Sequence, residues 1–268
     1  MGETYRYMED SLLFKGLTRT KQTLLQDRIK VEWTYTSNAL EGNTISLGDT
    51  AFILEEGLTI SGKTLKEHEE IVGHARAIDL VYALLSKDSL KKSDICDLHK
   101  AVQTMIIDIE CPLGEYKVVE NGTYSRIDGK LKYIAYPHPN DIDYLMKLWF
   151  DEFGDISNKT LSLEEAIMSY TRYHLAFTAI HPFFDGNGRV GRLVANIPML
   201  KNKYLPIIID VKKRKEYLEI LSNYKQNTKK LDDKAEKLIE ENIYLDKLFE
   251  FFKSQYNNSQ KLLDEIKN

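Results

Sequence analysis

The sequence predicts an all-α protein, mainly helical, that carries one small β-hairpin flap. Apolar residues recur at spacings of three and four through most of the 268 residues, which is the pattern of amphipathic helices packed on a core. β-branched and aromatic residues mix with turn-forming pairs in one segment, between Gly114 and Pro137, and this mixture is typical of a hairpin. Its turn pairs are Asn121-Gly122 and Asp128-Gly129. Helix is therefore expected to outnumber strand.

Composition and charge narrow the class of protein. A hydrophobic share of 43% and only six prolines indicate a globular chain, long enough to bury a substantial core. A net charge of −4 gives no general attraction to nucleic acid or to an anionic membrane, so neither is expected as a partner. Two cysteines, no apolar signal core and no apolar run of about 18 residues favour an unanchored cytoplasmic protein. A homo-oligomer is compatible with these properties.

Local signals place the helices. A first helix is expected from about Thr20 to Leu40, ending at Gly42, because apolar residues recur there at helical spacing without proline or glycine. Three residue pairs resemble capping boxes that start later helices: Ser46 with Asp49, Thr64 with Glu67, and Ser162 with Glu165. The charged, leucine-rich stretch from about Asp232 to Lys267 suits one or two amphipathic helices.

The most informative stretch runs from His181 to Arg192 and reads His-Pro-Phe-Phe-Asp-Gly-Asn-Gly-Arg-Val-Gly-Arg. The residues before it repeat at helical spacing, so a buried helix is expected to end near Ile180. Pro182 keeps the preceding histidine out of the α region, which places that histidine at the start of a loop. Helical spacing resumes from Arg189 to Lys201, with a late kink expected at Pro198.

The same stretch has the composition of an anion-binding site. Gly186, Asn187 and Gly188 can turn successive backbone N–H groups inward at a helix N-terminus, where the helix dipole adds positive potential. Arg189 and Arg192 share one helix face, so both can reach a polyphosphate held there. A phosphorylated ligand is therefore expected.

Two further side chains complete the chemistry of this stretch. Asp185 supplies a hard oxygen ligand that, together with phosphate oxygens, suits Mg²⁺. His181, with an unperturbed pKa of about 6.5, is the nearby group able to take a proton from a hydroxyl near neutral pH. The residues therefore predict nucleotidyl or phosphoryl transfer from a magnesium-bound triphosphate.

A competing interpretation exists, because Gly186 to Gly191 also reads G-x-G-x-x-G, the fingerprint of dinucleotide-binding folds. That fingerprint requires a strand directly before the glycines, whereas a long helix and a His-Pro turn precede them here. The dinucleotide interpretation is therefore set aside.

From His181 to Arg192 the stretch is similar to the Fic family motif H-x-F-x-[DE]-G-N-G-R-x-x-R and fits it at every specified position. The resemblance implies an enzyme that transfers AMP from ATP, with Mg²⁺, onto serine, threonine or tyrosine hydroxyls of proteins, including its own. It also implies the role of each motif residue: His181 as general base, Asp185 as magnesium ligand, Gly186, Asn187, Gly188 and Arg189 as ligands of the α- and β-phosphates, and Arg192 as ligand of the γ-phosphate. Gly188 stands where the related Doc-type phosphotransferases carry a lysine, which favours AMP transfer.

Ser37 to Gly42 resembles the inhibitory motif of the same family, [S/T]-x-x-x-E-[G/N]. In members that carry this motif on an N-terminal helix, its glutamate pairs with the second arginine of the Fic motif. The resemblance therefore implies that Glu41, one turn after Ser37, competes with the γ-phosphate for Arg192. Such competition exchanges one negative group for another on a guanidinium.

The resemblance covers about residues 30 to 225 and implies three parts: an N-terminal helical segment with the inhibitory motif (1–62), a Fic core domain (63–225) and a C-terminal helical extension (226–268). It implies that a target protein docks on the flap, at about 114–137, by adding a strand. Tyr217 is implied to line the adenine end of the pocket. Lys117 stands where the entry to the flap commonly carries arginine.

Other activities stay open. Glu41 could orient a water that removes AMP from a modified protein, or the enzyme could transfer a phosphorylated group other than AMP. A third alternative is a nucleotide-sensing module without catalysis. Three other histidines, His74, His99 and His174, lie within helical apolar patterns, and we interpret them as packed or surface residues outside the site.

Overall fold

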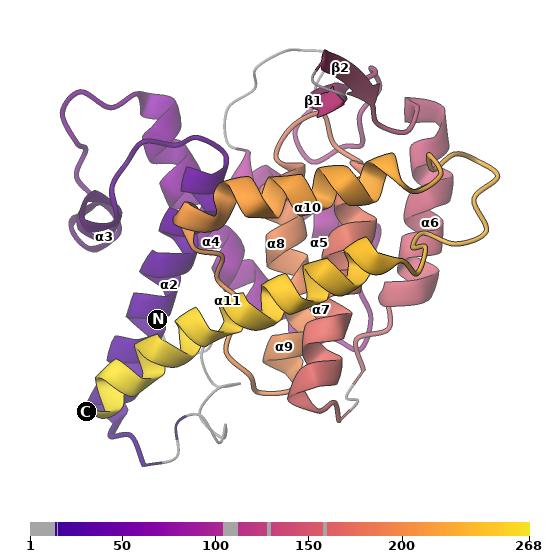
Figure 1. The fold of residues 1–268 in the computed structure, drawn as a ribbon. Helices are drawn as coiled ribbons and strands as arrows, with labels where there is room; N and C mark the ends of the chain where they lie inside the picture. Colours follow the sequence, from indigo (N-terminus) through magenta and orange to yellow (C-terminus); the bar gives the residue numbers. More distant parts are fainter. Residues whose placement is uncertain (1–13, 15, 104–111, 128–129, 158–159) are drawn as a thin grey trace.

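The structure is a computed structural model that describes the chain except for residues 1–13, 15, 104–111, 128–129 and 158–159. It confirms the predicted fold class, since the described residues form mostly helices and one small antiparallel sheet (Figure 1). Within these residues, no helix is both long and apolar enough to cross a membrane. Cys96 is buried with a free thiol, and Cys111 falls outside the described residues.

The described elements follow one another along the chain in this order: α2 (Arg19–Leu40), α3 (Leu47–Glu56), α4 (Leu65–Leu84), α5 (Lys92–Val102), β1 (Gly122–Ile127), β2 (Lys130–Ala135), the 3₁₀ turn η2 (Pro139–Asp141), α6 (Ile142–Phe153), α7 (Leu163–Ile180), α8 (Asn187–Ala195), α9 (Ile197–Lys201), the 3₁₀ turn η3 (Val211–Lys213), α10 (Arg214–Gln226) and α11 (Ile243–Lys267).

Helix α7 lies in the middle of the fold and packs against α8, α9, α6 and α11 (Figure 1). The apolar residues of α7 that recur at helical spacing include Tyr170 and Phe177, and both are fully buried. Trp149 of α6 contacts Phe177, and Phe252 of α11 contacts Tyr170, in each case edge to face. Burying one such side chain stabilises a fold by about 1.5–3 kcal/mol. The core therefore fixes the helix that ends at the His-Pro turn.

Helices α2 and α11, from opposite ends of the described chain, lie side by side and join the same core (Figure 1). Leu25, Ile29 and Trp33 supply the buried face of α2. The prediction of one or two helices after about residue 232 resolves into one, α11, which begins at Ile243. Because α2 is packed along its length, the residues at its C-terminal end have a fixed position.

The predicted helix starts are confirmed. Ser46 accepts a hydrogen bond from the backbone N–H of Asp49, while Thr64 with Glu67 and Ser162 with Glu165 form complete capping boxes. Each cap stabilises its helix by about 1 kcal/mol. The first helix also agrees with its prediction within one residue, since α2 runs from Arg19 to Leu40.

The predicted hairpin forms from β1 and β2, which pair antiparallel with Gly122 opposite Ala135 and Ile127 opposite Lys130. The turn pair Asp128-Gly129 falls outside the described residues, between the two strands. The prediction of a second turn at Asn121-Gly122 is wrong, because Gly122 is already the first residue of β1. A side chain at this position would collide with the ring of Tyr133, which gives the glycine a packing reason instead.

The helix predicted from Arg189 to Lys201 is interrupted earlier than its expected kink at Pro198. α8 ends at Ala195 and α9 begins at Ile197, with Asn196 between them. Pro198 lies in the first turn of α9, where proline is tolerated because the backbone donor it lacks has no helical partner. The side chain of Asn196 stabilises the break by accepting from the backbone N–H of residue 207 at 2.7 Å.

Candidate functional site

The residues from His181 to Gly186 form a short loop that joins α7 to α8. His181 caps α7 with a φ of 55°, in the left-handed region, and Gly186 caps α8 with a φ of 75°. The side chain of Asn187 closes the loop, because its Oδ1 accepts from the N–H of Phe183 at 2.9 Å and its Nδ2 donates to the carbonyl of Phe183 at 2.8 Å. Phe183 is fully buried. A left-handed residue other than glycine is disfavoured by about 1–2 kcal/mol, so these contacts hold His181 in a conformation it would otherwise avoid.

His99, interpreted from the sequence as a packed or surface residue, is packed and also holds this loop. Its ring stacks on Phe183 with centroids 3.9 Å apart. The N–H of Gly114 donates to Nδ1 at 2.9 Å, which leaves the proton on Nε2, 3.2 Å from the carbonyl oxygen of Asp185. Burial lowers the pKa of His99 to about 4, so the ring stays neutral and keeps this tautomer. No local sequence pattern marks this role, because His99 and Asp185 are 86 positions apart and meet only in the folded chain.

The N-terminus of α8 is where the sequence predicts an anion cradle, and the carboxylate of Glu41, the residue after α2, lies against it. The first N–H groups of a helix have no partner within the helix, so they are available to an acceptor. A side chain added at Gly188 would collide with Oε1 of Glu41, the residue that caps the end of α2. The space beside Gly188 is therefore filled by the carboxylate of Glu41, which lies where a bound anion would come close to this helix end.

Arg192 is buried and bound by α2. Its Nη2 lies 2.7 Å from Oε1 of Glu41 and 2.7 Å from the backbone carbonyl of Ser37, and its Nε donates to the Ser37 hydroxyl at 3.1 Å. Burial opposes the charge of Arg192, but Glu41 and the hydroxyl of Tyr217 outweigh it, so the pKa of Arg192 is raised. The implied contact between the inhibitory motif and the second motif arginine is present in the structure.

Arg189 is equally buried, with 3% of its surface exposed, yet its partners differ. Its Nη2 donates to Oε1 of Gln103 at 2.9 Å, and its Nη1 lies 3.4 Å from Oε1 of Glu70. Within the part of the chain that the structure describes, Nε and Nη1 of Arg189 have no hydrogen-bond partner. The two arginines thus lie near the same helix end but differ in their partners. Arg192 is bound by Glu41 and Ser37, whereas Nε and Nη1 of Arg189 have no hydrogen-bond partner among the described residues.

The ring of His181 is covered by residues from the flap and from α10. Tyr136, which directly follows β2, stacks on it with centroids 3.5 Å apart and an angle of 5° between the planes. The ammonium of Lys225 lies 3.3 Å from the centroid of the Tyr136 ring. Burial lowers the pKa of His181 well below its usual value, and the positive charges of Lys117 and Lys225 lower it further. The imidazole is therefore neutral at pH 7.

The two lysines near His181 are themselves perturbed. Burial and the charges of Lys117 and Lys230 lower the pKa of Lys225 to about 7, while burial and Lys230 lower that of Lys117 to about 8. The backbone N–H of Lys117 donates to the carbonyl of Pro182 at 2.9 Å, which ties the entry of the flap to the loop. These lysines give the surroundings of His181 a positive potential.

Asp185 is exposed, and its Oδ1 accepts from the N–H of Gly186 at 2.7 Å. The described residues contain no cluster of three acidic, histidine or cysteine side chains that would hold a metal by itself. Mg²⁺ in nucleotide sites is commonly bound by one or two carboxylates and completed by phosphate oxygens and waters. A single exposed aspartate beside an anion cradle fits that donor set.

Tyr217 of α10 is buried, and its hydroxyl lies 2.7 Å from Nε2 of His174. The same hydroxyl interacts with Arg192, and burial raises the pKa of Tyr217 to about 12. His174 is also fully buried, and burial together with Arg192 lowers its pKa to about 3. Tyr217 and His174 therefore form a neutral support beneath Arg192, a role for His174 that its place in an apolar helix pattern did not indicate.

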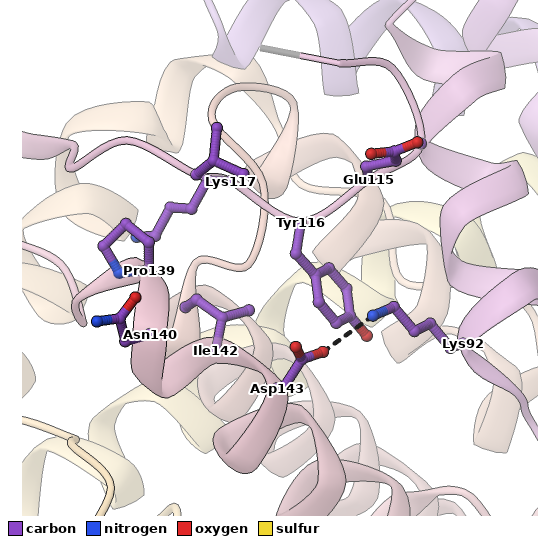
Figure 2. Close-up of a pocket in the computed structure, with 10 residues that line it drawn as sticks. Lys92, Glu115, Tyr116, Lys117, Pro139, Asn140, Ile142 and Asp143 are labelled. Atoms are coloured by element: carbon purple, nitrogen blue, oxygen red, sulfur yellow. Dashed lines mark hydrogen bonds and ion pairs between the residues drawn. The ribbon is translucent and has the colours of Figure 1, made fainter. Parts of the chain in front are cut away.

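A cleft of about 740 Å³ lies beside the segment that leads into the flap (Figure 2). Tyr116 and Lys117 line it together with the start of α6, and Lys92 pairs with Asp143 across its floor at 2.9 Å. Among the described residues of the predicted flap segment, 114–118 line this cleft, and no residue of the motif from His181 to Arg192 does. The cleft is therefore separate from the anion cradle.

Comparison with known proteins gives consistent similarities. Residues 89–199 match the sequence model described as the Fic/DOC family. The protein adenylyltransferase fic-1 of Caenorhabditis elegans is 34% identical over 188 residues, which are 69% of this chain and 34% of that protein. The protein adenylyltransferase Fic of Drosophila willistoni is 33% identical over 189 residues, or 70% of this chain and 35% of that protein. The chain thus covers about a third of the length of these curated relatives.

Solved structures show the same fold. A Fic domain containing signaling protein from Bacteroides thetaiotaomicron superimposes with a TM-score of 0.77 at 24% identity, over 98% of this chain and 96% of that one. Residues 134–508 of Fic-1 from C. elegans give a TM-score of 0.71 at 24% identity, over 98% of this chain and 69% of that one. At these identities the likeness supports the fold alone.

Proposed function

Residues 89–199 form a Fic domain of the Fic/DOC family, and from this premise we propose that the protein transfers AMP from ATP onto hydroxyl side chains of proteins. The curated relatives named above are protein adenylyltransferases. The observation that carries the proposal is a convergence: a neutral histidine, a glycine-lined helix N-terminus and two buried arginines lie within twelve consecutive residues. A base and an anion site so close together suit transfer from a phosphate ester.

His181 is the proposed general base. Because its pKa lies well below 6.5, it is already neutral at pH 7 and can take the proton of an acceptor hydroxyl. The hydroxyl oxygen then forms a bond to the α-phosphorus while the bond from that phosphorus to the bridging oxygen breaks. AMP stays on the protein, and pyrophosphate leaves with the bridging oxygen.

The remaining motif residues hold the triphosphate. We assign the α- and β-phosphates to Gly186, Asn187, Gly188 and Arg189, and the γ-phosphate to Arg192. Asp185 would hold Mg²⁺, which when bound neutralises charge on the phosphates. The donors Nε and Nη1 of Arg189, buried without a hydrogen-bond partner among the described residues, support its assignment to a ligand. On the resemblance alone we assign Tyr217 to the adenine end of the pocket, although its contact with Arg192 also lets it support the arginine assigned to the γ-phosphate.

Glu41 is the proposed brake. Its carboxylate binds Arg192 at 2.7 Å, where it competes with the γ-phosphate, and it also reaches the space beside Gly188, at the edge of the cradle assigned to the α- and β-phosphates. Ser37 adds two further contacts to Arg192. ATP can place its γ-phosphate only when Glu41 leaves, because two negative groups cannot share the same guanidinium edge. The chain with Glu41 in place is therefore expected to transfer little AMP.

The flap is the proposed docking site for the target protein. In the hairpin, Tyr124 and Tyr133 pair across the strands and both are exposed, as is Leu131. An exposed two-stranded sheet with apolar side chains can accept a third strand from a target. For the chain as a whole we propose three parts: an inhibitory segment (1–62), a Fic core (63–225) and a C-terminal extension (226–268).

A second activity deserves a test because of one observation. The side chain of Glu41 remains 42% exposed while it binds Arg192, so water can reach its carboxylate. A carboxylate beside a phosphate site can orient a water that releases AMP from a modified protein. This reaction would need Glu41, whereas AMP transfer would be blocked by it.

Labelled ATP distinguishes these activities. We expect Glu41→Gly to transfer label from α-labelled ATP to protein and the added change His181→Ala to abolish the transfer. Label arriving from γ-labelled ATP in place of α-labelled ATP would replace AMP transfer with phosphotransfer. Release of AMP from a modified target by the unchanged chain, lost in Glu41→Gly, would assign the hydrolytic activity.

A further inference from the structure

Arg189 is aimed by two side chains that the family motif does not include. Gln103, at the end of α5, accepts from Nη2 at 2.9 Å, and Glu70 of α4 approaches Nη1 at 3.4 Å. Glu70 is also only 16% exposed, so its charge acts through little solvent. These contacts come from two different helices and fix the plane of the guanidinium.

Glu70 is in turn held by the chain that follows the inhibitory helix. Its Oε2 accepts from Nδ2 of Asn43 at 2.9 Å. Asn43 is fixed as well, because its backbone N–H donates to the carbonyl of Asn38 at 3.1 Å and its Oδ1 accepts from the N–H of Ile45 at 3.0 Å. A line of contacts therefore runs from Asn43, two residues after Glu41, through Glu70 to Arg189.

The contact between Glu70 and Arg189 differs in kind from the one between Glu41 and Arg192. At 3.4 Å it is an ion pair without a hydrogen bond, and Nη1 of Arg189 keeps its donor. At 2.7 Å, Glu41 is in direct contact with Nη2 of Arg192, and the same Nη2 also donates to the carbonyl of Ser37. Glu70 thus orients its arginine without occupying it.

The surroundings of Glu70 on α4 agree with an orienting role. His74, one turn further along α4, is fully buried, and burial together with Arg192 and Arg189 lowers its pKa well below the usual value. His74 is therefore neutral and adds no charge between the two arginines. Glu70 is then the carboxylate of α4 that balances Arg189.

We propose that Glu70, held by Asn43, is a positioning residue that directs Arg189 toward the α- and β-phosphates of the nucleotide. The inference rests on the proposed function, in which Arg189 binds those phosphates. It means that the segment after α2 has two opposite effects on the site. Glu41 blocks it, whereas Asn43 supports it.

Nucleotide binding to the Glu41→Gly protein tests this positioning role, with ADP and adenosine as ligands measured by calorimetry. We expect Glu70→Gln and Asn43→Ala, each added to Glu41→Gly, to weaken ADP binding about tenfold, the size of one misaligned charge-assisted hydrogen bond. Adenosine binding should stay unchanged, because adenosine has no phosphate for Arg189 to hold. The ADP affinity of Glu70→Asp should lie between those of Glu70→Gln and the Glu41→Gly parent. Glu56 is exposed at the end of α3, and Glu56→Gln should bind ADP as the parent does.

The sign of the effect decides the outcome. Unchanged or tighter ADP binding in Glu70→Gln would overturn the proposal, because a carboxylate that merely repels phosphate improves binding when it is removed. Equal losses for ADP and adenosine would also overturn it and indicate a structural role. Binding needs no turnover, so a Glu41→Gly protein that binds ADP and transfers no AMP contradicts the proposed activity while the Glu70 comparison still stands.

Discussion

Arg189 and Arg192 lie one turn apart on α8 and are buried to the same degree, but different residues bind their guanidinium groups. Arg192 is bound by Ser37 of α2 and by Glu41, which follows that helix. Arg189 is oriented by Gln103 and Glu70, and its Nε and Nη1 have no hydrogen-bond partner among the described residues. The difference lies in the helices that reach each arginine and not in the motif they share. Regulation can therefore act on the contact proposed between Arg192 and the γ-phosphate, while Arg189 stays oriented toward the α- and β-phosphates.

The largest effect is expected from removing Arg189, the arginine that Glu41 does not bind. Arg189→Ala in the Glu41→Gly protein should lower the rate of AMP transfer about a thousandfold, as the loss of a preorganised charge at a reacting phosphate does in other enzymes. Transfer of label from α-labelled ATP measures the rate. A loss of less than about tenfold would show that Arg189 contributes little to holding the reacting phosphate.

A smaller effect should come from removing one contact of Arg192 while Glu41 is left unchanged. Ser37→Ala removes the hydroxyl that Nε of Arg192 contacts at 3.1 Å and leaves the carbonyl contact in place. We expect basal AMP transfer by the otherwise unchanged chain to rise about fivefold, because one hydrogen bond to a charged group is lost from the inhibited state. In the Glu41→Gly protein the same change should have no such effect. A rise of equal size in both proteins would separate Ser37 from the brake.

His181, like Arg189, is already in the state that the proposed reaction needs, because its imidazole is neutral. The pH dependence of AMP transfer tests this. Its pKa in the folded protein is lowered by burial, so the neutral base persists as pH falls below 6.5 and activity is lost only at more acid pH. Tyr136→Ala in the Glu41→Gly protein exposes the imidazole, which raises its pKa toward the usual value. The acid limb of the pH–rate profile should therefore move to higher pH. A limb that stays in place would assign the low pKa to Lys117 and Lys225 in place of the stacked ring.

The features that local sequence dictates were predictable. Side-chain caps such as that of Ser162, and the end of α7 at Ile180 before a His-Pro turn, depend on residues a few positions apart. The motif from His181 to Arg192 and the pairing of Arg192 with Glu41 were accessible through the family resemblance. These parts give the fold class and most of the proposed site.

Contacts between distant segments were not predictable from the sequence. His99, Glu70 and Lys225 meet the site from α5, α4 and α10, and nothing near each residue marks its partner. Asn121-Gly122 has the composition of a turn, yet the Asn121 side chain donates to the carbonyl of Phe184 at 2.9 Å and Gly122 begins a strand. Tertiary contacts decided all four cases.

The relative affinity for ATP and ADP tests the central claim, that Glu41 withholds Arg192 from the γ-phosphate. The unchanged chain should bind magnesium complexes of ATP and ADP with similar affinity, because the γ-phosphate has no free guanidinium. Glu41→Gly should bind ATP about tenfold more tightly than ADP, the gain from one charge-assisted contact. A preference for ATP of that size in the unchanged chain, or no change of the ratio in Glu41→Gly, would contradict the account.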